Sequence, residues 1–179
     1  MPGRPGVDRI PAQKPDLTRR YTPSVTAAKV RVPAQPGWFT LDPEEPALLG
    51  SRCVSCGTVA FPKETAFCRN PDCLGASFDE VELSRRGRIW SFTDARYQPP
   101  EPYVAVDPYQ PFCIAAVELA AEQMVVLGQV VPGISADELA IGTEMELVLD
   151  TLYEDDDSQY LVWKWAPAAA NARTEAAGA

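Results

Sequence analysis

The second half of the chain alternates short apolar runs with turn-forming residues. Each run is rich in Val, Ile, Leu or aromatic residues, the side chains that fit a pleated, half-buried strand. Between the third and fourth runs, Ser135 stands at the N-cap position of one helical turn, which we expect to end near Gly142. The pattern therefore predicts a mainly β fold with five strands, over residues 87–97, 111–119, 123–131, 144–153 and 159–165.

A five-stranded barrel is the architecture that this order of elements favours. A short helical element between the third and fourth strands is typical of an OB fold. Tudor-like and SH3-like barrels stay open as alternatives, since the number of strands does not fix their order. The segment YQPPEPYVAVDPYQP, residues 97–111, is too rich in proline for a strand. We expect it to project as a loop between the first two strands, where OB folds bind ligands.

Four of the five cysteines form two close pairs, CVSC and CRNPDC, separated by eleven residues. Such pairs let two turns each present two thiolates to one ion, and Gly57 suits the positive φ of the first turn. Four protein ligands leave no open position for water or substrate, so the site is predicted to hold a structural Zn²⁺. The predicted ligands are Cys53, Cys56, Cys68 and Cys73.

Other uses of the cysteines fit the sequence less well. A redox CxxC at Cys53 and Cys56 belongs at a strand-to-helix junction of a thioredoxin-like βαβ unit, which the pattern lacks. An iron–sulfur cluster is a second alternative, but the usual ferredoxin spacings are absent. The fifth cysteine, Cys113, lies in the apolar run PFCIAAVEL and is predicted to be a small core residue.

The two ends of the chain lack any sustained apolar period. Residues 1–35 are spaced with prolines and hold seven Lys or Arg against two Asp. We expect a flexible basic arm, which is either a disordered leader or a segment that orders against an acidic or anionic partner. The Ala-rich residues 168–179 are predicted to be a disordered tail. Between these ends the sequence predicts a rubredoxin-like zinc ribbon over residues 36–82 and a five-stranded OB-fold barrel over residues 83–167.

Composition excludes several classes of function. The chain of 179 residues contains no histidine, which removes the commonest general base and most Ser-His or Cys-His nucleophile pairs. The net charge of −9, with fourteen acidic against five basic residues over 83–167, argues against a nucleic-acid-binding protein. No apolar run approaches the roughly 18 residues that span a bilayer, and no signal peptide is evident. We therefore expect a cytoplasmic protein without a catalytic centre of its own.

Residues 38–167 resemble the zinc-ribbon and OB-fold proteins associated with acyl-CoA metabolism, first catalogued as domain of unknown function thirty-five. The resemblance is carried, in this order, by CVSCGTVAFPKETAFC and the second cysteine pair, then GRIWSFTDAR, DPYQPFCIAAVELA, VVLGQV and LAIGTEMELVL. The spacing of four residues within the second cysteine pair departs from the family, where two is common. This departure leaves open only the local shape of that turn.

The resemblance implies a partner of thiolase-superfamily enzymes, which lacks a catalytic centre, packs against the thiolase-like subunit and helps to form or shield its acyl-CoA channel. Within the family, the long N-terminal arm and the closing stretch DTLYEDDDSQYLVWKWAP are most similar to the partners of lipid-transfer-protein-type thiolases and retro-aldolases that shorten steroid side chains in actinobacteria. The alternative function is a nucleic-acid-binding ribbon and OB module, since both folds often serve that role.

Coenzyme A presents phosphates and an adenine ring, which basic and flat aromatic side chains bind. For the basic candidates named at the end of this paragraph, the alternative interpretation is a solvated turn that makes weak surface ion pairs. The last strand carries Trp163 and Trp165 on one face, and we interpret them as core packing or as a protein interface. The acidic run 154–157 is predicted to be a solvated hairpin between the fourth and fifth strands. The candidate acyl-CoA-binding residues are Lys63, Arg85, Arg86, Arg88 and Trp90.

Overall fold

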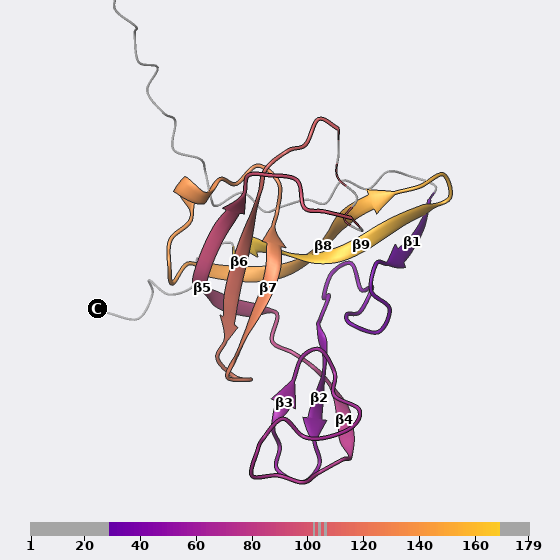
Figure 1. The fold of residues 1–179 in the computed structure, drawn as a ribbon, viewed down its shortest axis with the longest axis vertical. Coiled ribbons are helices and arrows are strands. Elements are labelled where there is room, and N and C mark those ends of the chain that lie inside the picture. The colour runs from indigo at the N-terminus through magenta and orange to yellow at the C-terminus, as the bar shows by residue number, and fades with distance from the viewer. Residues whose placement is uncertain (1–28, 102, 104, 106, 169–179) are drawn as a thin grey trace, which may run out of the picture.

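Two β-sheets make up the part of the chain that the computed structural model describes, residues 29–101, 103, 105 and 107–168. The larger sheet wraps into a barrel, and a three-stranded sheet lies beyond one side of it (Figure 1). No helix in this part of the chain is long and apolar enough to cross a membrane. The elements are β1 (Val30–Pro33), β2 (Leu49–Cys53), β3 (Val59–Ala60), β4 (Phe78–Glu82), β5 (Arg86–Ala95), β6 (Phe112–Leu119), β7 (Met124–Val130), the 3-10 turn η1 (Ala136–Glu138), β8 (Glu144–Glu154) and β9 (Ser158–Pro167).

The barrel closes through five strands. Antiparallel pairing runs from β5 to β6 and on to β7, and β7 pairs in parallel with β9. β9 then pairs antiparallel with β8, and β8 returns to the start of β5. The third and fifth barrel strands are therefore neighbours, which is the strand order of an OB fold. This order decides among the barrel types that the strand count had left open.

The predicted strands and turn are all present. Each predicted strand coincides with one of β5 to β9, and the ends differ by no more than two residues. The predicted helical turn is η1, where the Glu138 carboxylate accepts hydrogen bonds from the backbone N–H and the hydroxyl of Ser135, at 2.6 and 2.9 Å. These two hydrogen bonds stabilise the start of the turn. Gly142 follows with a φ of 85°, in the left-handed region that glycine favours.

The core of the barrel is filled by alternate side chains of these strands. Trp165 is its largest fully buried side chain, and Gly128 on the neighbouring β7 makes room for it. A Cβ atom at Gly128 would lie 2.8 Å from the Trp165 ring, closer than two carbon atoms can approach. Cys113 is buried in this core as predicted, and burial raises the pKa of its thiol. The other large side chains of the barrel that are fully buried are those of Ile89, Val117, Leu119, Met145 and Leu147.

The structure places a strand, β1, at the end of the segment that was predicted to be a flexible arm. Residues 30–33 fall within the predicted flexible arm, yet they pair in parallel with β9 from Ser158 to Leu161. Two β-branched residues favour the extended conformation, and β9 extends beyond the barrel so that its edge is open to them. Lys29 adds an ion pair with Glu154, at 3.0 Å. Residues 1–28 and 169–179 lie outside the described residues, so the arm and tail expected there stay predictions.

Four aromatic rings join the small sheet to the barrel. Trp163 of β9 stacks on Trp38 with ring centroids 5.9 Å apart. Phe61, which follows β3 in the ribbon, meets both rings edge-on at 5.8 and 5.5 Å. Phe39 contacts Trp163 in the same way, at 5.8 Å. Such pairs contribute about 0.5–1.5 kcal/mol each beyond their buried area. This junction cluster therefore fixes the ribbon against one end of the barrel.

The proline-rich segment between β5 and β6 forms a loop as predicted, and its described residues contain no strand. Its base is tied to the barrel, because the Tyr109 hydroxyl donates a hydrogen bond to the Ala95 carbonyl at 2.7 Å. The Tyr103 ring also stacks on Phe112 at the start of β6, with centroids 5.8 Å apart. The loop is thus anchored by aromatic residues at its exit from the barrel.

Candidate metal centre

The three-stranded sheet positions the cysteine pairs. β2 ends at Cys53, where the chain turns so that the Gly57 N–H donates to the Cys53 carbonyl at 2.8 Å. Gly57 has a φ of 77°, which confirms the conformation predicted for it. The second turn closes from Cys73 N–H to the Asn70 carbonyl at 3.0 Å, and the Asn70 side chain accepts from Asp72 N–H at 3.0 Å. Both turns therefore use the residues that the sequence offers for them.

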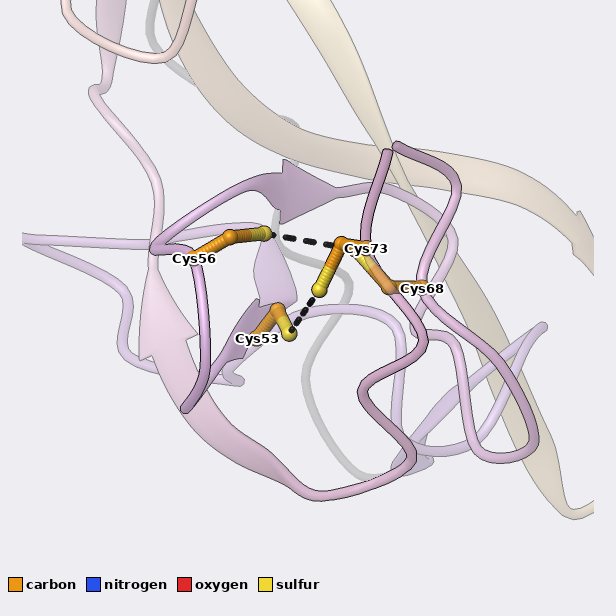
Figure 2. Close-up of side chains that lie close together, drawn as sticks. All are labelled: Cys53, Cys56, Cys68 and Cys73. Carbon is orange, nitrogen blue, oxygen red and sulfur yellow. Dashed lines mark hydrogen bonds between the residues drawn. The ribbon is translucent and has the colours of Figure 1, made fainter. Parts of the chain in front are cut away.

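The four sulfur atoms converge on one point (Figure 2). All of them lie within 4.8 Å of one another, with 3.8 Å between Cys53 and Cys73 and 3.5 Å between Cys56 and Cys68. A tetrahedron with zinc–sulfur bonds of about 2.3 Å has sulfur atoms about 3.8 Å apart. The arrangement fits a zinc ion, and each close pair takes one sulfur from each turn.

Backbone and hydroxyl donors surround the sulfur atoms. Asn70 N–H donates to Cys68 Sγ at 3.4 Å, and Gly75 N–H donates to Cys73 Sγ at 3.3 Å. The Thr58 hydroxyl lies 3.2 Å from Cys56 Sγ, and hydrogen bonds from this side chain and then its backbone lower the pKa of Cys56 to about 6. Such donors favour thiolate, the form that binds metal. At Cys68 and Cys73 the backbone donors are outweighed by burial and the neighbouring thiols, which raise the pKa of both.

The donor set identifies a structural site. Thiolate-only coordination by four protein ligands fills the tetrahedron and leaves no position for water or substrate. Gly75 is required beside the sulfur atoms, since a Cβ there would lie 2.8 Å from Cys53 Sγ. The cofactor is therefore one structural Zn²⁺. The longer spacing in CRNPDC does not prevent the second pair from meeting the first.

The candidate acyl-CoA residues lie in three separate surroundings. Arg85 and Arg86 both pair with the Glu146 carboxylate of β8, at 3.1 and 3.2 Å, while Lys63 pairs with Glu80 inside the ribbon. Arg88 and Trp90 are exposed on β5, and Trp90 shows 61% of its surface. Surface ion pairs of this kind contribute little to stability. These ion pairs do, however, engage the charged groups of Lys63, Arg85 and Arg86, three of the five candidates. Acyl-CoA binding by the five residues stays a prediction.

The two tryptophans of β9 pack within the chain. Trp165 is fully buried in the barrel, so core packing accounts for it rather than contact with another protein. Trp163 is partly buried in the junction cluster, where its indole N–H donates to the Leu127 carbonyl at 3.2 Å. The interface that Trp163 forms is thus the one between ribbon and barrel. The aromatic partners of Trp163 were not predicted from the sequence. They are Trp38, Phe39 and Phe61, and the only signal for them was their position on either side of the first ribbon strand.

Comparison with known proteins agrees with this geometry. The chain matches the family model of the ChsH2 rubredoxin-like zinc ribbon domain over residues 42–79 and that of the ChsH2 C-terminal OB-fold domain over residues 80–150. It is 30% identical over 121 residues to a DUF35 domain-containing scaffold protein of Methanocaldococcus jannaschii, covering 67% of this chain and 79% of that protein. The chain belongs to the DUF35 family. The resemblance seen in the sequence motifs is therefore confirmed.

Two further similar proteins carry names that describe parts of enzymes. The chain with the zinc ribbon and barrel described above is 40% identical over 87 residues to the benzoylsuccinyl-CoA thiolase subunit BbsA of Thauera aromatica. The alignment covers 49% of this chain and 50% of that subunit. Among solved structures, this chain is similar to a chain of an Ltp2-ChsH2(DUF35) aldolase, with 30% identity and a TM-score of 0.49, covering 68% of this chain and 84% of that one. The alignment with BbsA thus spans half of that relative.

Proposed function

We propose that this DUF35 protein is a non-catalytic accessory subunit that binds a thiolase-superfamily enzyme and helps to form its acyl-CoA site. The observation that carries the proposal is the 40% identity to a thiolase subunit over 87 residues. A closed barrel, a zinc-stapled ribbon and an aromatic junction between them suit a rigid scaffold, whose surfaces keep fixed positions for a partner. Rigid elements lower the entropy that is lost on association.

The catalytic partner that we propose is a lipid-transfer-protein-type retro-aldolase or thiolase, which acts in the cytoplasm on CoA thioesters with a steroid side chain. Support comes from the long N-terminal arm and the closing β8–β9 segment, whose sequences resemble those of such partners. The two matching family models, which are both those of ChsH2, add to this support. Acyl-CoA is proposed to be shared with the partner, and Arg88 is the candidate phosphate ligand that enters no ion pair among the described residues.

The chemistry is assigned to the partner because cleavage of a carbon–carbon bond beside a thioester needs an acid–base pair and a group that stabilises the enolate. This chain has no histidine. The acidic residues at the β8–β9 turn, Glu154 to Asp157, are exposed. The Lys29 ammonium group lowers the pKa of Glu154, and the backbone N–H of Ser158 lowers that of Asp155. Neither carboxyl group is suited to donate a proton near neutral pH.

Turnover should require both subunits. We expect the purified chain to cleave no acyl-CoA, and we expect a cognate thiolase-like subunit to gain activity or stability when the two are mixed. The measurement is retro-aldol or thiolytic cleavage of a bulky acyl-CoA, with each protein alone and with both together. Cleavage by this chain alone contradicts the proposal. So does a partner that works equally well without the chain and does not bind it.

Single-stranded DNA or RNA should not bind measurably at physiological salt. The barrel region carries fourteen acidic against five basic residues, so it repels phosphate rather than releasing counterions. Fluorescence anisotropy of a labelled oligonucleotide should stay flat when the chain is titrated in, and a variant lacking residues 1–28 controls for the basic N-terminus. Submicromolar binding by that variant would revive the nucleic-acid-binding alternative.

A further inference from the structure

One outer face of the barrel is apolar at its centre. Along β7, Val125 and Leu127 point outward with 44% and 64% of their surfaces exposed. Leu127 lies opposite Ala116 of β6, and Ala116 lies opposite Ser91 of β5, directly beside the exposed Trp90. Residues directly opposite each other in the register lie on the same face of a sheet, so Leu127, Ala116 and Ser91 share one surface. We call it the β5–β7 face.

A β-bulge in β5 turns the side chain of Trp90 toward this face. Ile89 pairs with Val117 and Ser91 with Ala116, so Trp90 is an extra residue on β5 with no partner of its own on β6. Ile89 points into the core at 1% exposure, whereas Trp90 is 61% exposed. Bulges re-aim side chains and are frequent beside functional sites. An outward tryptophan on a rigid strand is costly in water and is the residue type most enriched at binding hot spots.

The charges beside the face are balanced. Arg88 and Val125 lie on either side of Glu118 in the strand register, so one positive and one negative side chain border the apolar centre. An apolar centre with a polar rim is the usual composition of a protein interface. A nucleic acid does not suit this face, since a single arginine cannot neutralise a phosphate backbone. A second copy is disfavoured too, because each chain carries a net charge of −9.

We propose that the β5–β7 face, centred on Trp90 and Leu127, docks the apolar surface of the thiolase-like catalytic subunit. The proposal rests on the accessory-subunit function and assigns a location to it. In OB folds the corresponding face, that of the second and third strands, is where ligands bind. Here the outward residues of β6 and β7 include the apolar Ala116, Val125 and Leu127, and neither strand contains a basic residue, which suits a protein occupant. Trp90 then serves as an interface anchor instead of an adenine platform.

A second group of exposed apolar side chains provides a matched control. Val54, Phe67 and Leu74 each adjoin a zinc ligand at the ribbon tip, and Leu74 is 97% exposed. They come from turns rather than from a paired sheet, and no tryptophan is among them. The experiment can therefore compare one leucine on each surface, with the same substitution at both.

Binding of the purified cognate thiolase-like subunit is measured by calorimetry for the wild type and three variants. Trp90→Ala and Leu127→Asp should each weaken the affinity by about thirtyfold or more. Leu74→Asp should change it by less than about threefold, as expected for a residue outside the interface. All three side chains are exposed, so the melting temperatures should stay near that of the wild type. Hydrogen exchange on the wild-type complex should also show new protection in β6 and β7.

The outcomes separate the two proposals. If the wild type does not bind the catalytic subunit, the accessory function itself fails. If the wild type binds and Trp90→Ala and Leu127→Asp bind equally well, the function stands and the assigned face is wrong. Loss of binding in Leu74→Asp alone moves the interface to the ribbon tip. A concentration-dependent dimer of the isolated wild type that Leu127→Asp dissolves assigns the face to self-association and also overturns the proposal.

Discussion

Replacing Cys73 by Ser should abolish zinc binding and unfold the ribbon while the barrel stays folded. Structural zinc contributes roughly 10–16 kcal/mol of apparent binding free energy in small zinc-finger peptides. The ribbon has little else to hold it, since its sheet has three strands and β3 contains two residues. The barrel closes through its own five strands and does not need the metal. Elemental analysis should give one zinc per wild-type chain and none in Cys73→Ser.

The matched control for this change is Cys113→Ala, which removes a cysteine from the barrel core and should leave the zinc content unchanged. Hydrogen exchange distinguishes the two parts of the molecule. In Cys73→Ser, the amides of β2 and β4 should exchange freely, whereas those of β6 and β7 should stay protected. Tryptophan emission should shift to the red, because Phe61 no longer covers Trp163. Iron in place of zinc, or a zinc-free wild type that stays folded, contradicts the prediction.

Trp165→Ala should destabilise the barrel by about 3–5 kcal/mol, the usual cost of deleting a large buried side chain. The side chain is fully buried, and Gly128 beside it has no side chain with which to fill the cavity. A loss of this size is a large part of the roughly 5–15 kcal/mol that stabilises a typical domain. Urea unfolding measures the change, with Trp90→Ala as the control at an exposed tryptophan. The control should lie within about 0.5 kcal/mol of the wild type. A loss below about 1 kcal/mol for Trp165→Ala refutes the assigned packing.

Local patterns in the sequence predicted the elements and the metal site. The strands follow runs of β-branched and aromatic residues, and the ends of the turn are marked by Ser135 and a glycine. The zinc ligands were predictable because both turns are built from residues close in sequence. Gly57 and Asn70 form these turns wherever the rest of the chain lies. The predicted division into ribbon and barrel rests on the same local signals.

Pairings between distant segments could not be predicted in this way. Residues 30–33 read as a continuation of a proline-spaced arm, and only the open edge of β9 makes them a strand. The alternation along β9 placed Trp163 and Trp165 on one face of the strand. It could not show that Trp38 and Phe61 cover Trp163. The bulge at Trp90 interrupts the period of two, so the direction of this side chain depends on the register with β6. These features are set by tertiary structure, which overrides local preference.

The strand β9 also sets the order in which the molecule can be assembled. It pairs with β1, β7 and β8, and it supplies Trp163 to the junction cluster, yet it is synthesised after all three of these strands and after the whole ribbon. Synthesis proceeds at roughly 5–20 residues per second, so β1 waits many seconds for a partner that is encoded more than a hundred positions later. The four zinc ligands emerge within a short stretch and can capture their ion long before. Metal loading is then an early, local event, whereas barrel closure and ribbon docking are completed together once β9 has been synthesised.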